Sequence, residues 1–600
     1  MSMHKDTPLQ ADTVGRLNTK AETATINGSP ALSVVIASYN RAEQLRSCLA
    51  ALAQQTQSPT DYEVVVVVDG STDATAQMLA DLAPAYQLRV LQQSNQGQAV
   101  ALNVGIQVAR GQYCLLLDDD IVVAPQLVAE HLRVQRAYDG VVGLGHLKRT
   151  LPPHADGFAR SLQHWLDKHY QRFSAGGDAP SFMDCYSGNL SAPRAALLAV
   201  GGFAADLPRS YDVELGYRLQ AHGLRCVYIP DAIGDEDFRK GFREITRDAE
   251  LAGMASVELY HRHPAMLPYI GLGAFAEASF GPLYARRLLL AMPHQDWLLQ
   301  LLSHVLGHSP YAHLWFAFLH TYYFWRGVRR AVPRDRWRQY TSGTVLLLYH
   351  AFGTDGEPPS RYIVPQRRLR YQMAWLKWRR YHVLSLDEFL EYRRTYRFPP
   401  ARSVVITIDD GYADNNTVAF PIFRRYGFPA TIFVVSSAVG THNWWDNTGA
   451  LSGRSLLTWQ AIHEMRPDGI TFGAHTRTHP VLPTCNPERC MDELEGSRLE
   501  LEHALKQPIR TFAYPYGEFD NVTLDAAEKA GFWAACSVRR GLNTPVTPVY
   551  ALRRTTIHGT DSLVHFVVAL HCGRTTLPLR QLGQQLLDAA RRWYQTRGHR

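Results

Sequence analysis

YEVVVVVDGSTD (residues 62–73) and GQYCLLLDDD (residues 111–120) are apolar runs that each end in a group of acidic residues. A third run, SVVIASYN (residues 33–40), ends in polar residues in the same way. Short apolar runs that alternate with helical stretches are typical of a mostly parallel α/β sheet. In such sheets ligands bind beyond the carboxyl ends of the strands. Residues 31–262 are therefore predicted to form an α/β domain with an acidic site at one edge of its sheet.

The C-terminal part of the chain, residues 341–600, repeats this pattern with four apolar runs that end in polar residues. The runs are VLLLYH (345–350), SVVITIDD (403–410), TIFVVS (431–436) and ITFGAH (470–475). Polar groups at the ends of successive parallel strands converge on one face, as at the C-terminal rim of a (β/α) barrel. The second domain is therefore predicted to be a distorted (β/α) barrel.

The length of 600 residues is too great for a single hydrophobic core. Two large domains joined by a helical segment at residues 263–340 account for it. Residues 1–30 are polar and have no apolar run after their positive charges, which predicts a disordered tail without a secretory signal. The protein is therefore expected in the cytoplasm, where its eight scattered cysteines should stay reduced.

The segment from Trp297 to Trp325 contains no Asp, Glu, Lys or Arg, and an arginine-rich stretch follows it. Four histidines and Pro310 make it a poor membrane-spanning helix. It suits either an aromatic helix in a membrane interface or a helical lid packed on the first domain or between the domains. The net charge of +7 is concentrated at residues 326–402, which could meet anionic lipid or a sugar diphosphate or form a solvated face. No nucleic-acid fold signature accompanies it, so nucleic acid is not an expected partner.

The first acidic group suits glycosyl transfer from a nucleoside diphosphate. That reaction needs a carboxylate for the nucleobase or ribose, a divalent metal at the diphosphate and a base for the acceptor hydroxyl. Asp69 and Asp73 sit where a strand meets a loop, although Asp73 could instead cap a helix. Asp118, Asp119 and Asp120 offer hard oxygen ligands for Mg²⁺ or Mn²⁺, and adjacent carboxylates need a cation nearby.

The motifs of this region resemble those of the family 2 glycosyltransferases, which have the GT-A (Rossmann-like) fold. The resemblance lies in SVVIASYN, VVDGSTD, NQGQAVALNVGI and LLLDDD, in this order over roughly 200 residues. It implies that Asp69 binds the nucleobase and that Asn95 and Gly97 line the nucleotide pocket. It further implies that Asp118 touches the ribose or the diphosphate, and that Asp120 binds the metal.

A second stretch, SYDVELGYRL, resembles the acidic motif of the same family, in which an Asp at a helix start is the general base. Asp212 keeps this carboxylate, while Tyr211 replaces the usual preceding Glu. Asp235 stands where relatives often carry a metal-binding His. The sequence has no QxxRW motif of processive synthases, so transfer of one sugar is the favoured outcome.

The second polar group, TIDDG (407–411) with HTRTH (475–479), suits metal-dependent hydrolysis of an amide or ester. Such a site needs ligands with one open position, a base and donors for the tetrahedral oxyanion. His475 and His479 are four residues apart, so a helical turn would place both rings on one side, where they can share a metal with Asp410.

These motifs, together with VLLLYHAF, FPATIFVV, LTWQAI and FAYPYGEFD, resemble the polysaccharide deacetylases of carbohydrate esterase family 4, also called the NodB-homology domain. The resemblance implies that Asp409 is the base. It also implies that Asp410, His475 and His479 hold Zn²⁺ or a similar ion, and that the backbone N–H of Tyr516 helps to stabilise the oxyanion.

Two further residues of this family are harder to place. The family's third motif often has an Arg before Pro-Tyr-Gly, whereas Ala513 and Tyr514 stand here and Arg510 lies a little earlier. The general acid is expected in a late histidine motif, for which His558 and His350 are the candidates. Trp444, Trp445 and Trp459 could stack on sugar rings.

Together the two motif sets predict a bifunctional enzyme that transfers an N-acetylhexosamine, expected from UDP-N-acetylglucosamine, and removes its N-acetyl group. The acceptor would be a glycan, a lipid-linked molecule or a small molecule, with peripheral contact at the inner face of the membrane as an option. One alternative is a processive chitin-like synthase with an attached deacetylase. The other is a carbohydrate-binding or scaffold protein with one degenerate catalytic domain.

Overall fold

The computed structural model describes residues 29–576 except 174–176, 278–279, 293–295, 308–311, 355, 358–359 and 447–448. Nearly all of the tail expected at residues 1–30 lies outside the described residues. The chain forms two compact units. The N-terminal unit comprises Met1–Leu259 and Pro293–Val328, and the C-terminal unit comprises Tyr260–Met292 and Arg329–Arg600.

The N-terminal unit is built on an eight-stranded sheet in the order β3-β2-β1-β4-β7-β6-β8-β5. Strands β1 to β4 pair in parallel, so their carboxyl ends share one edge, while β7 runs antiparallel to β4 and β6. The strands are β1 (Leu32–Ser38), β2 (Tyr62–Asp69), β3 (Gln87–Gln93), β4 (Tyr113–Asp118), β5 (Ile121–Val123), β6 (Val141–Thr150), β7 (Asn189–Pro193) and β8 (Arg225–Asp237).

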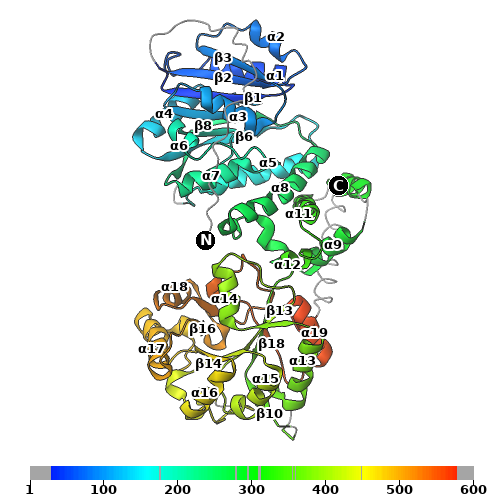
Figure 1. Cartoon of the computed structure of the whole chain (residues 1–600), viewed down its shortest axis with the longest axis vertical. Helices are drawn as coiled ribbons and strands as arrows, with labels where there is room; N and C mark the ends of the chain where they lie inside the picture. Colours follow the sequence, from blue (N-terminus) through cyan, green and yellow to red (C-terminus); the bar gives the residue numbers. More distant parts are fainter. Residues whose placement is uncertain are drawn as a thin grey trace, which may run out of the picture. The chain divides into compact units, whose positions relative to one another are not determined.

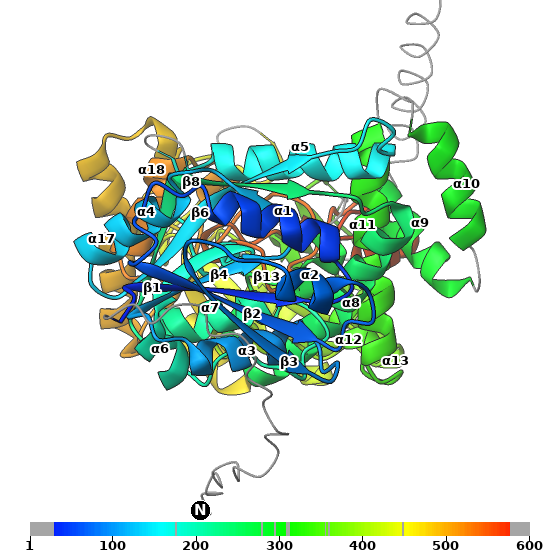
Figure 2. The same cartoon turned by 90° about the horizontal axis from the view of Figure 1, so that it is seen from above.

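Both faces of this sheet are buried beneath helices. Because successive side chains of a strand point to opposite faces, each strand contributes to two cores. On β1, Val34 and Ile36 join the core beneath α1, whereas Val35 and Ala37 join the core beneath α3. Figure 2 shows α1 on one side of the sheet and α3 and α6 on the other. The helices are α1 (Ala42–Leu52), α2 (Thr75–Ala80), α3 (Gln98–Val108), α4 (Leu127–Ala137), α5 (Gly157–Gln171), α6 (Arg194–Ala199), α7 (Tyr211–Ala221), α8 (Phe242–Arg262), α10 (Asp296–Leu306) and α11 (Ala312–Ala331).

The C-terminal unit is built on a curled, fully parallel sheet in the order β17-β16-β15-β14-β13-β9-β18, with β12 added beside β13. This arrangement confirms the distorted (β/α) barrel predicted from the apolar runs. A short parallel pair, β10 (Ala351–Gly353) and β11 (Ile363–Pro365), lies outside it. The strands are β9 (Val345–Tyr349), β12 (His382–Leu384), β13 (Ser403–Ile408), β14 (Ala430–Val434), β15 (Ile470–Ala474), β16 (Thr511–Ala513), β17 (Ala534–Cys536) and β18 (Thr555–Thr556).

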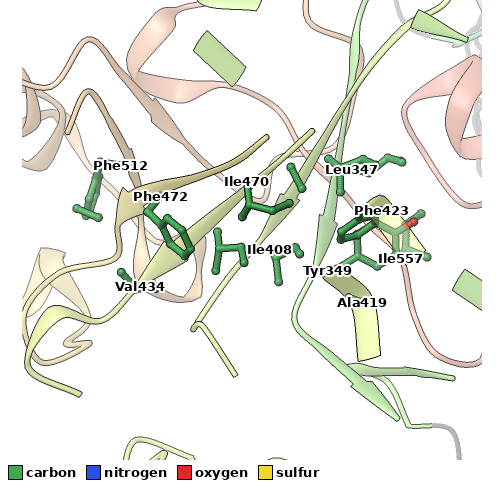
Figure 3. Close-up of a cluster of buried hydrophobic side chains, with 14 of the residues drawn as sticks. Leu347, Tyr349, Ile408, Ala419, Phe423, Val434, Ile470, Phe472, Phe512 and Ile557 are labelled. Atoms are coloured by element: carbon green, nitrogen blue, oxygen red, sulfur yellow. The ribbon is translucent and has the colours of Figure 1, made fainter. Parts of the chain in front are cut away.

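Helices cover the outer face of the curled sheet, where Tyr349, Ile408, Val434 and Phe472 form one cluster with helical side chains such as Phe423 (Figure 3). The inner face forms a smaller cluster with α14. Figure 1 shows the helices around this sheet. They are α13 (Gln366–Trp378), α14 (Leu386–Arg394), α15 (Phe420–Tyr426), α16 (Trp459–Met465), α17 (Pro487–Leu505), α18 (Asn521–Lys529) and α19 (Leu563–Cys572).

The segment expected to join the domains supplies helices to both units. Helix α10 and most of α11 group with the N-terminal unit, whereas α9 (Phe280–Ala291) and α12 (Trp337–Thr341) group with the C-terminal unit. The described part of the stretch from Trp297 to Trp325 lies in α10 and α11 and in the residues next to α10. Within the described ranges, no helix combines the length and the apolar composition that crossing a membrane requires.

Candidate active sites

The carboxyl ends of the parallel strands in the N-terminal unit open into a cavity of about 610 Å³. Its lining includes four residues singled out from the sequence, Asp69, Asp118, Asp120 and Asp212. The first three follow or end β2 and β4, and Asp212 lies in the first turn of α7. The parallel pairing of β1 with β2 and β4 brings them to one edge.

Asp69 orders the loop that follows β3. One of its carboxylate oxygens accepts a hydrogen bond from the backbone N–H of Gln96 (2.8 Å), and the other accepts one from that of Gly97 (2.8 Å). Gly70 has φ +73°, and a Cβ there would lie 2.6 Å from the backbone nitrogen of Asn95. Glycine is therefore needed for the loop to pack against the end of β2.

Asp73, Asn95 and Gly97 do not line the cavity, although all three are described residues. Asp73 accepts hydrogen bonds from the backbone N–H groups of Thr75 (3.1 Å) and Ala42 (3.2 Å) at the starts of two helices. Slight burial raises its pKa, but these hydrogen bonds outweigh burial and lower it overall. Asp73 thus ties together the starts of α1 and α2, and nucleotide binding by these three residues stays a prediction.

The three consecutive aspartates already have one cation beside them. Arg41 Nη1 lies 2.9 Å from Asp119 Oδ1 and 2.7 Å from Asp120 Oδ2. Burial, followed by the charges of Asp120 and Asp119, raises the pKa of Asp118 to about 8. Burial also raises the pKa of Asp120 to about 6, even though Arg41 opposes the shift. One guanidinium group does not satisfy these carboxylates, and the group therefore fits a divalent cation.

Glu236 is a cavity residue that the sequence reasoning missed. On β8, Asp235 turns away to accept a hydrogen bond from Thr150 Oγ1 (2.8 Å), whereas Glu236 lines the cavity and pairs with Arg149 Nε (2.7 Å). The charge of Glu236 also raises the pKa of Asp118. The period-two alternation of a strand would have identified Glu236, had the register of β8 been known.

Asp212 faces the same cavity, and the departure at Tyr211 has a structural role. Burial raises the pKa of Asp212, against a hydrogen bond from the backbone of Val213 that lowers it. Tyr211 Oη bonds to Gln98 Oε1 (2.8 Å), and Gln98 Nε2 donates to Asp118 Oδ1 (2.8 Å). Tyr211 therefore holds the side chain that contacts Asp118.

In the C-terminal unit the structure brings together Asp410 after β13 with His475 and His479 after β15. The Nε2 atoms of both histidines lie 3.4 Å from Asp410 Oδ1, and all three side chains are buried. His475 Nδ1 donates to the carbonyl oxygen of Ala513 (2.7 Å), which leaves the lone pair on Nε2. Their ligand atoms lie within 4.8 Å of one another, so the group fits a zinc-like ion.

The expectation that the two histidines share a helical turn is wrong. Residues 475–479 form a loop in which Thr476 and His479 have positive φ values of 65° and 63°. The carboxylate of Glu493, on α17, accepts hydrogen bonds from the backbone N–H groups of Arg477 and Thr478, both at 2.9 Å. A neighbouring helix, rather than helical periodicity, therefore sets the geometry of the histidines.

Asp409 forms a buried ion pair with Arg554. The two guanidinium nitrogens of Arg554 lie 2.6 and 2.7 Å from the two oxygens of Asp409, and Arg554 is fully buried. Burial raises the pKa of Asp409, but the charges of Arg554, His475 and His350 and the hydrogen bonding of Arg554 together outweigh burial and keep the pKa below its ordinary value. Arg510 instead lies over the Trp533 ring. The sequence alone does not identify Arg554, because its partner Asp409 lies far away along the chain.

A cavity of about 350 Å³ is lined by Asp409, Asp410, His475 and His479, together with His350, His558, Trp445 and Tyr516. His558 Nδ1 donates to the carbonyl oxygen of Arg361 (3.0 Å), which orients the ring. The ring of Trp445 stacks on His479 at 4.7 Å, and burial lowers the pKa of His350. Tyr516 has φ 58° in the turn Pro515–Gly517, and its ring lies 4.7 Å from that of His479.

Comparison with known proteins assigns each unit. Residues 33–191 match the Glycosyl transferase family 2 model, and residues 397–535 match the Polysaccharide deacetylase model. The chain is 30% identical over 293 residues to validoxylamine A glucosyltransferase of Streptomyces hygroscopicus subsp. jinggangensis, over 43% of this chain and 67% of that enzyme.

The C-terminal unit has its own relatives. The chain is 30% identical over 225 residues to poly-β-1,6-N-acetyl-D-glucosamine N-deacetylase of Staphylococcus aureus strain MRSA252, over 36% of this chain and 74% of that enzyme. The solved structure of the Streptococcus pyogenes deacetylase PplD in complex with acetate is 25% identical, with a TM-score of 0.33, over 37% of this chain and 95% of that one. The chain thus belongs both to glycosyl transferase family 2, through its N-terminal unit, and to the polysaccharide deacetylases, through its C-terminal unit.

Proposed function

We propose that this chain transfers an N-acetylhexosamine from a nucleoside diphosphate donor to an acceptor and then hydrolyses the N-acetyl group of the product. The proposal is supported by the presence of two sites on one chain. The first is an acidic transferase cavity, and the second is a buried Asp-His-His group beside Asp409, which is paired with Arg554. The staphylococcal relative is named for N-acetyl-D-glucosamine, which supports UDP-N-acetylglucosamine as the donor.

In the transferase cavity, Asp118 and Asp120 would hold Mg²⁺ or Mn²⁺, which neutralises charge on the diphosphate leaving group. Asp69 would contact the nucleobase from the end of β2, with Asp73, Asn95 and Gly97 behind it. Asp212 would take the proton of the acceptor hydroxyl, and its raised pKa makes the carboxylate a stronger base.

In the deacetylase cavity, Asp410, His475 and His479 would hold Zn²⁺ or a similar ion, which supplies Lewis-acid activation of water and of the amide carbonyl. Asp409, kept ionised by Arg554, would take the proton of the attacking water. The backbone N–H of Tyr516 would donate to the oxyanion, and His558 Nε2 would give a proton to the departing amine.

The lining of the transferase cavity also bears on the acceptor. Beyond the acidic edge it contains apolar side chains, including Leu162, Trp165 and Leu166, together with the cation of Lys240. Helix α10 exposes Trp297 (69%) and Val305 (69%) to solvent. Both observations support an acceptor with an apolar part, such as a lipid-linked molecule, and peripheral membrane contact on the cytoplasmic side.

Residues 31–262 and 341–600 remain our proposed boundaries of the transferase domain and the deacetylase domain.

Separate assays of UDP and acetate release test this function. The purified protein would receive UDP-N-acetylglucosamine, a divalent metal and a lipid extract as acceptor. The wild type should release both products, Asp212→Asn should release neither, and Asp410→Asn should release UDP alone. If acetate release is unchanged in Asp212→Asn, the two sites do not act in series.

A further inference from the structure

Two arginine side chains at the deacetylase cavity have no role in the chemistry proposed above. Arg361 lies between β10 and β11, and Arg540 follows β17, and both line the cavity that contains Asp410 and His475. Both side chains are exposed to solvent. They come from distant parts of the sequence, and the folding of the C-terminal unit brings them to one cavity.

Neither guanidinium group has a carboxylate partner among the residues that the structure describes. Other arginines of this unit do have partners. Arg454 pairs with Asp414 (2.6 Å) and Glu357 (2.8 Å), and Arg554 pairs with Asp409. An arginine without a partner at the mouth of a site is free to bind an anion from solution.

The other charges of the lining leave these two cations only partly compensated. The charge of Asp409 is balanced by Arg554, and Asp410 lies with two histidines that are suited to hold a cation. Among the residues that line the cavity, Asp446 is then the one remaining carboxylate, whereas Arg361 and Arg540 supply two positive charges. The cavity therefore attracts negative charge. A neutral N-acetylated glycan has no anionic group that could bind to these guanidinium groups.

The surroundings of Arg361 place its charge near the proposed reaction. Its carbonyl oxygen accepts the hydrogen bond of His558 Nδ1 (3.0 Å). Its guanidinium group lies over the Tyr362 ring (5.3 Å), whose other neighbour is the His350 ring (5.0 Å). An anionic group bound by Arg361 would therefore lie in the same cavity as Asp410, His475 and His479.

We propose that the deacetylase cavity takes an N-acetylated sugar that carries a phosphate group, which Arg361 and Arg540 bind. The proposal rests on the deacetylase function above and narrows its substrate class. The amide C–N bond is cleaved by water, which supplies the hydroxyl of acetic acid and a proton of the amine, and the phosphate is unchanged. A cavity of about 350 Å³ lies at the small end of ligand pockets, about 300 to 1,000 Å³, which suits one sugar with its substituent.

Acetate release from matched substrates tests the proposal. N-Acetylglucosamine 1-phosphate, N-acetylglucosamine 6-phosphate and neutral methyl N-acetylglucosaminide would be compared in the wild type, Arg361→Gln, Arg540→Gln and Arg539→Gln. Arg539 is the matched control, because its guanidinium group lies over the Phe519 ring (4.3 Å) and it does not line the cavity. Comparison of the 1-phosphate with the 6-phosphate shows at which position of the sugar the phosphate group is bound.

The expected result is that a phosphorylated sugar is the better substrate and that each cavity variant raises its KM about 10-fold more than that of the neutral sugar. Arg539→Gln should behave as the wild type. Equal losses on charged and neutral substrates, or an unchanged KM, would overturn the proposal.

A binding measurement separates this proposal from the deacetylase function itself. Calorimetric titration of glucosamine 1-phosphate into the chelator-treated protein should show binding that weakens with salt and that is lost in Arg361→Gln and Arg540→Gln. Absence of acetate release from every substrate would refute the deacetylase function, while this titration would still decide the phosphate site. No binding by the wild type would refute the phosphate site alone.

Discussion

At the scale of single residues, Arg554 is the main partner that favours the ionised form of Asp409. Burial alone would raise the pKa of Asp409, and the guanidinium group of Arg554, together with the nearby histidines, lowers it below its ordinary value. A lowered pKa in the folded state stabilises the protein above the unfolded pKa, and this stabilisation is lost as the pH falls. Arg554→Gln should therefore move the acidic limb of the acetate-release profile to higher pH, and about 3 kcal/mol of stability should be lost.

Profiles of kcat against pH and denaturant melts would measure both effects, with Arg539→Gln as the control. An acidic limb that stays in place in Arg554→Gln would show that the ion pair does not set the protonation of Asp409.

Also at the residue scale, the raised pKa values of Asp118 (about 8) and Asp120 (about 6) predict a pH-dependent need for metal. Because the folded pKa values exceed the unfolded ones, the metal-free protein should lose stability as the pH rises from about 4 to about 8. Added Mn²⁺ should raise the melting temperature more at pH 8 than at pH 5. Asp118→Asn should stabilise the metal-free protein at pH 8 and weaken the Mn²⁺ effect.

Thermal melts with chelator or Mn²⁺ at the two pH values test this. A wild-type Mn²⁺ effect that is equal at pH 5 and pH 8, or that Asp118→Asn leaves unchanged, would show that these carboxylates do not compose the site.

At the scale of elements, α17 shapes the loop that carries both metal-ligating histidines. Glu493 accepts two backbone hydrogen bonds from this loop and is itself buried. Glu493→Ala should therefore loosen the loop and weaken metal affinity about 10- to 100-fold, as loss of an outer partner of a ligand does. Competition with a chromogenic chelator would measure the affinity, with Glu495→Ala on the exposed side of α17 as the control.

If Glu493→Ala and Glu495→Ala retain the metal equally well, the hydrogen bonds from α17 do not determine the site.

The elements also show what the sequence could predict. Apolar runs that end in polar residues marked β2, β4, β13 and β15, since burial on both faces leaves a clear signal and parallel pairing aligns the strand ends. The positions of Asp409, Asp410 and His475 followed from that signal. The helical turn proposed for His475 and His479 failed, because a tertiary contact with α17 sets that loop.

Partners that are distant in sequence gave no signal. Arg554 pairs with a carboxylate 145 positions away, and Glu236 faces the transferase cavity only because of the register of β8. Arg41, at the start of α1, pairs with both Asp119 and Asp120. Each contact depends on how strands and helices are placed in space, which short motifs do not record.

At the scale of the whole molecule, we propose that the two units act in series on one sugar. Each unit has a cavity of its own, lined by residues of that unit. Series action then requires that the transferase product be the deacetylase substrate, and inactivating one site should leave a defined intermediate.

The most direct measurement is the mass of the product formed from UDP-N-acetylglucosamine by the wild type and by Asp410→Asn. Action in series predicts a free amino sugar on the acceptor with the wild type, and the same product carrying one acetyl group with Asp410→Asn. An acetylated product from both proteins, or a free amine from both, would contradict it.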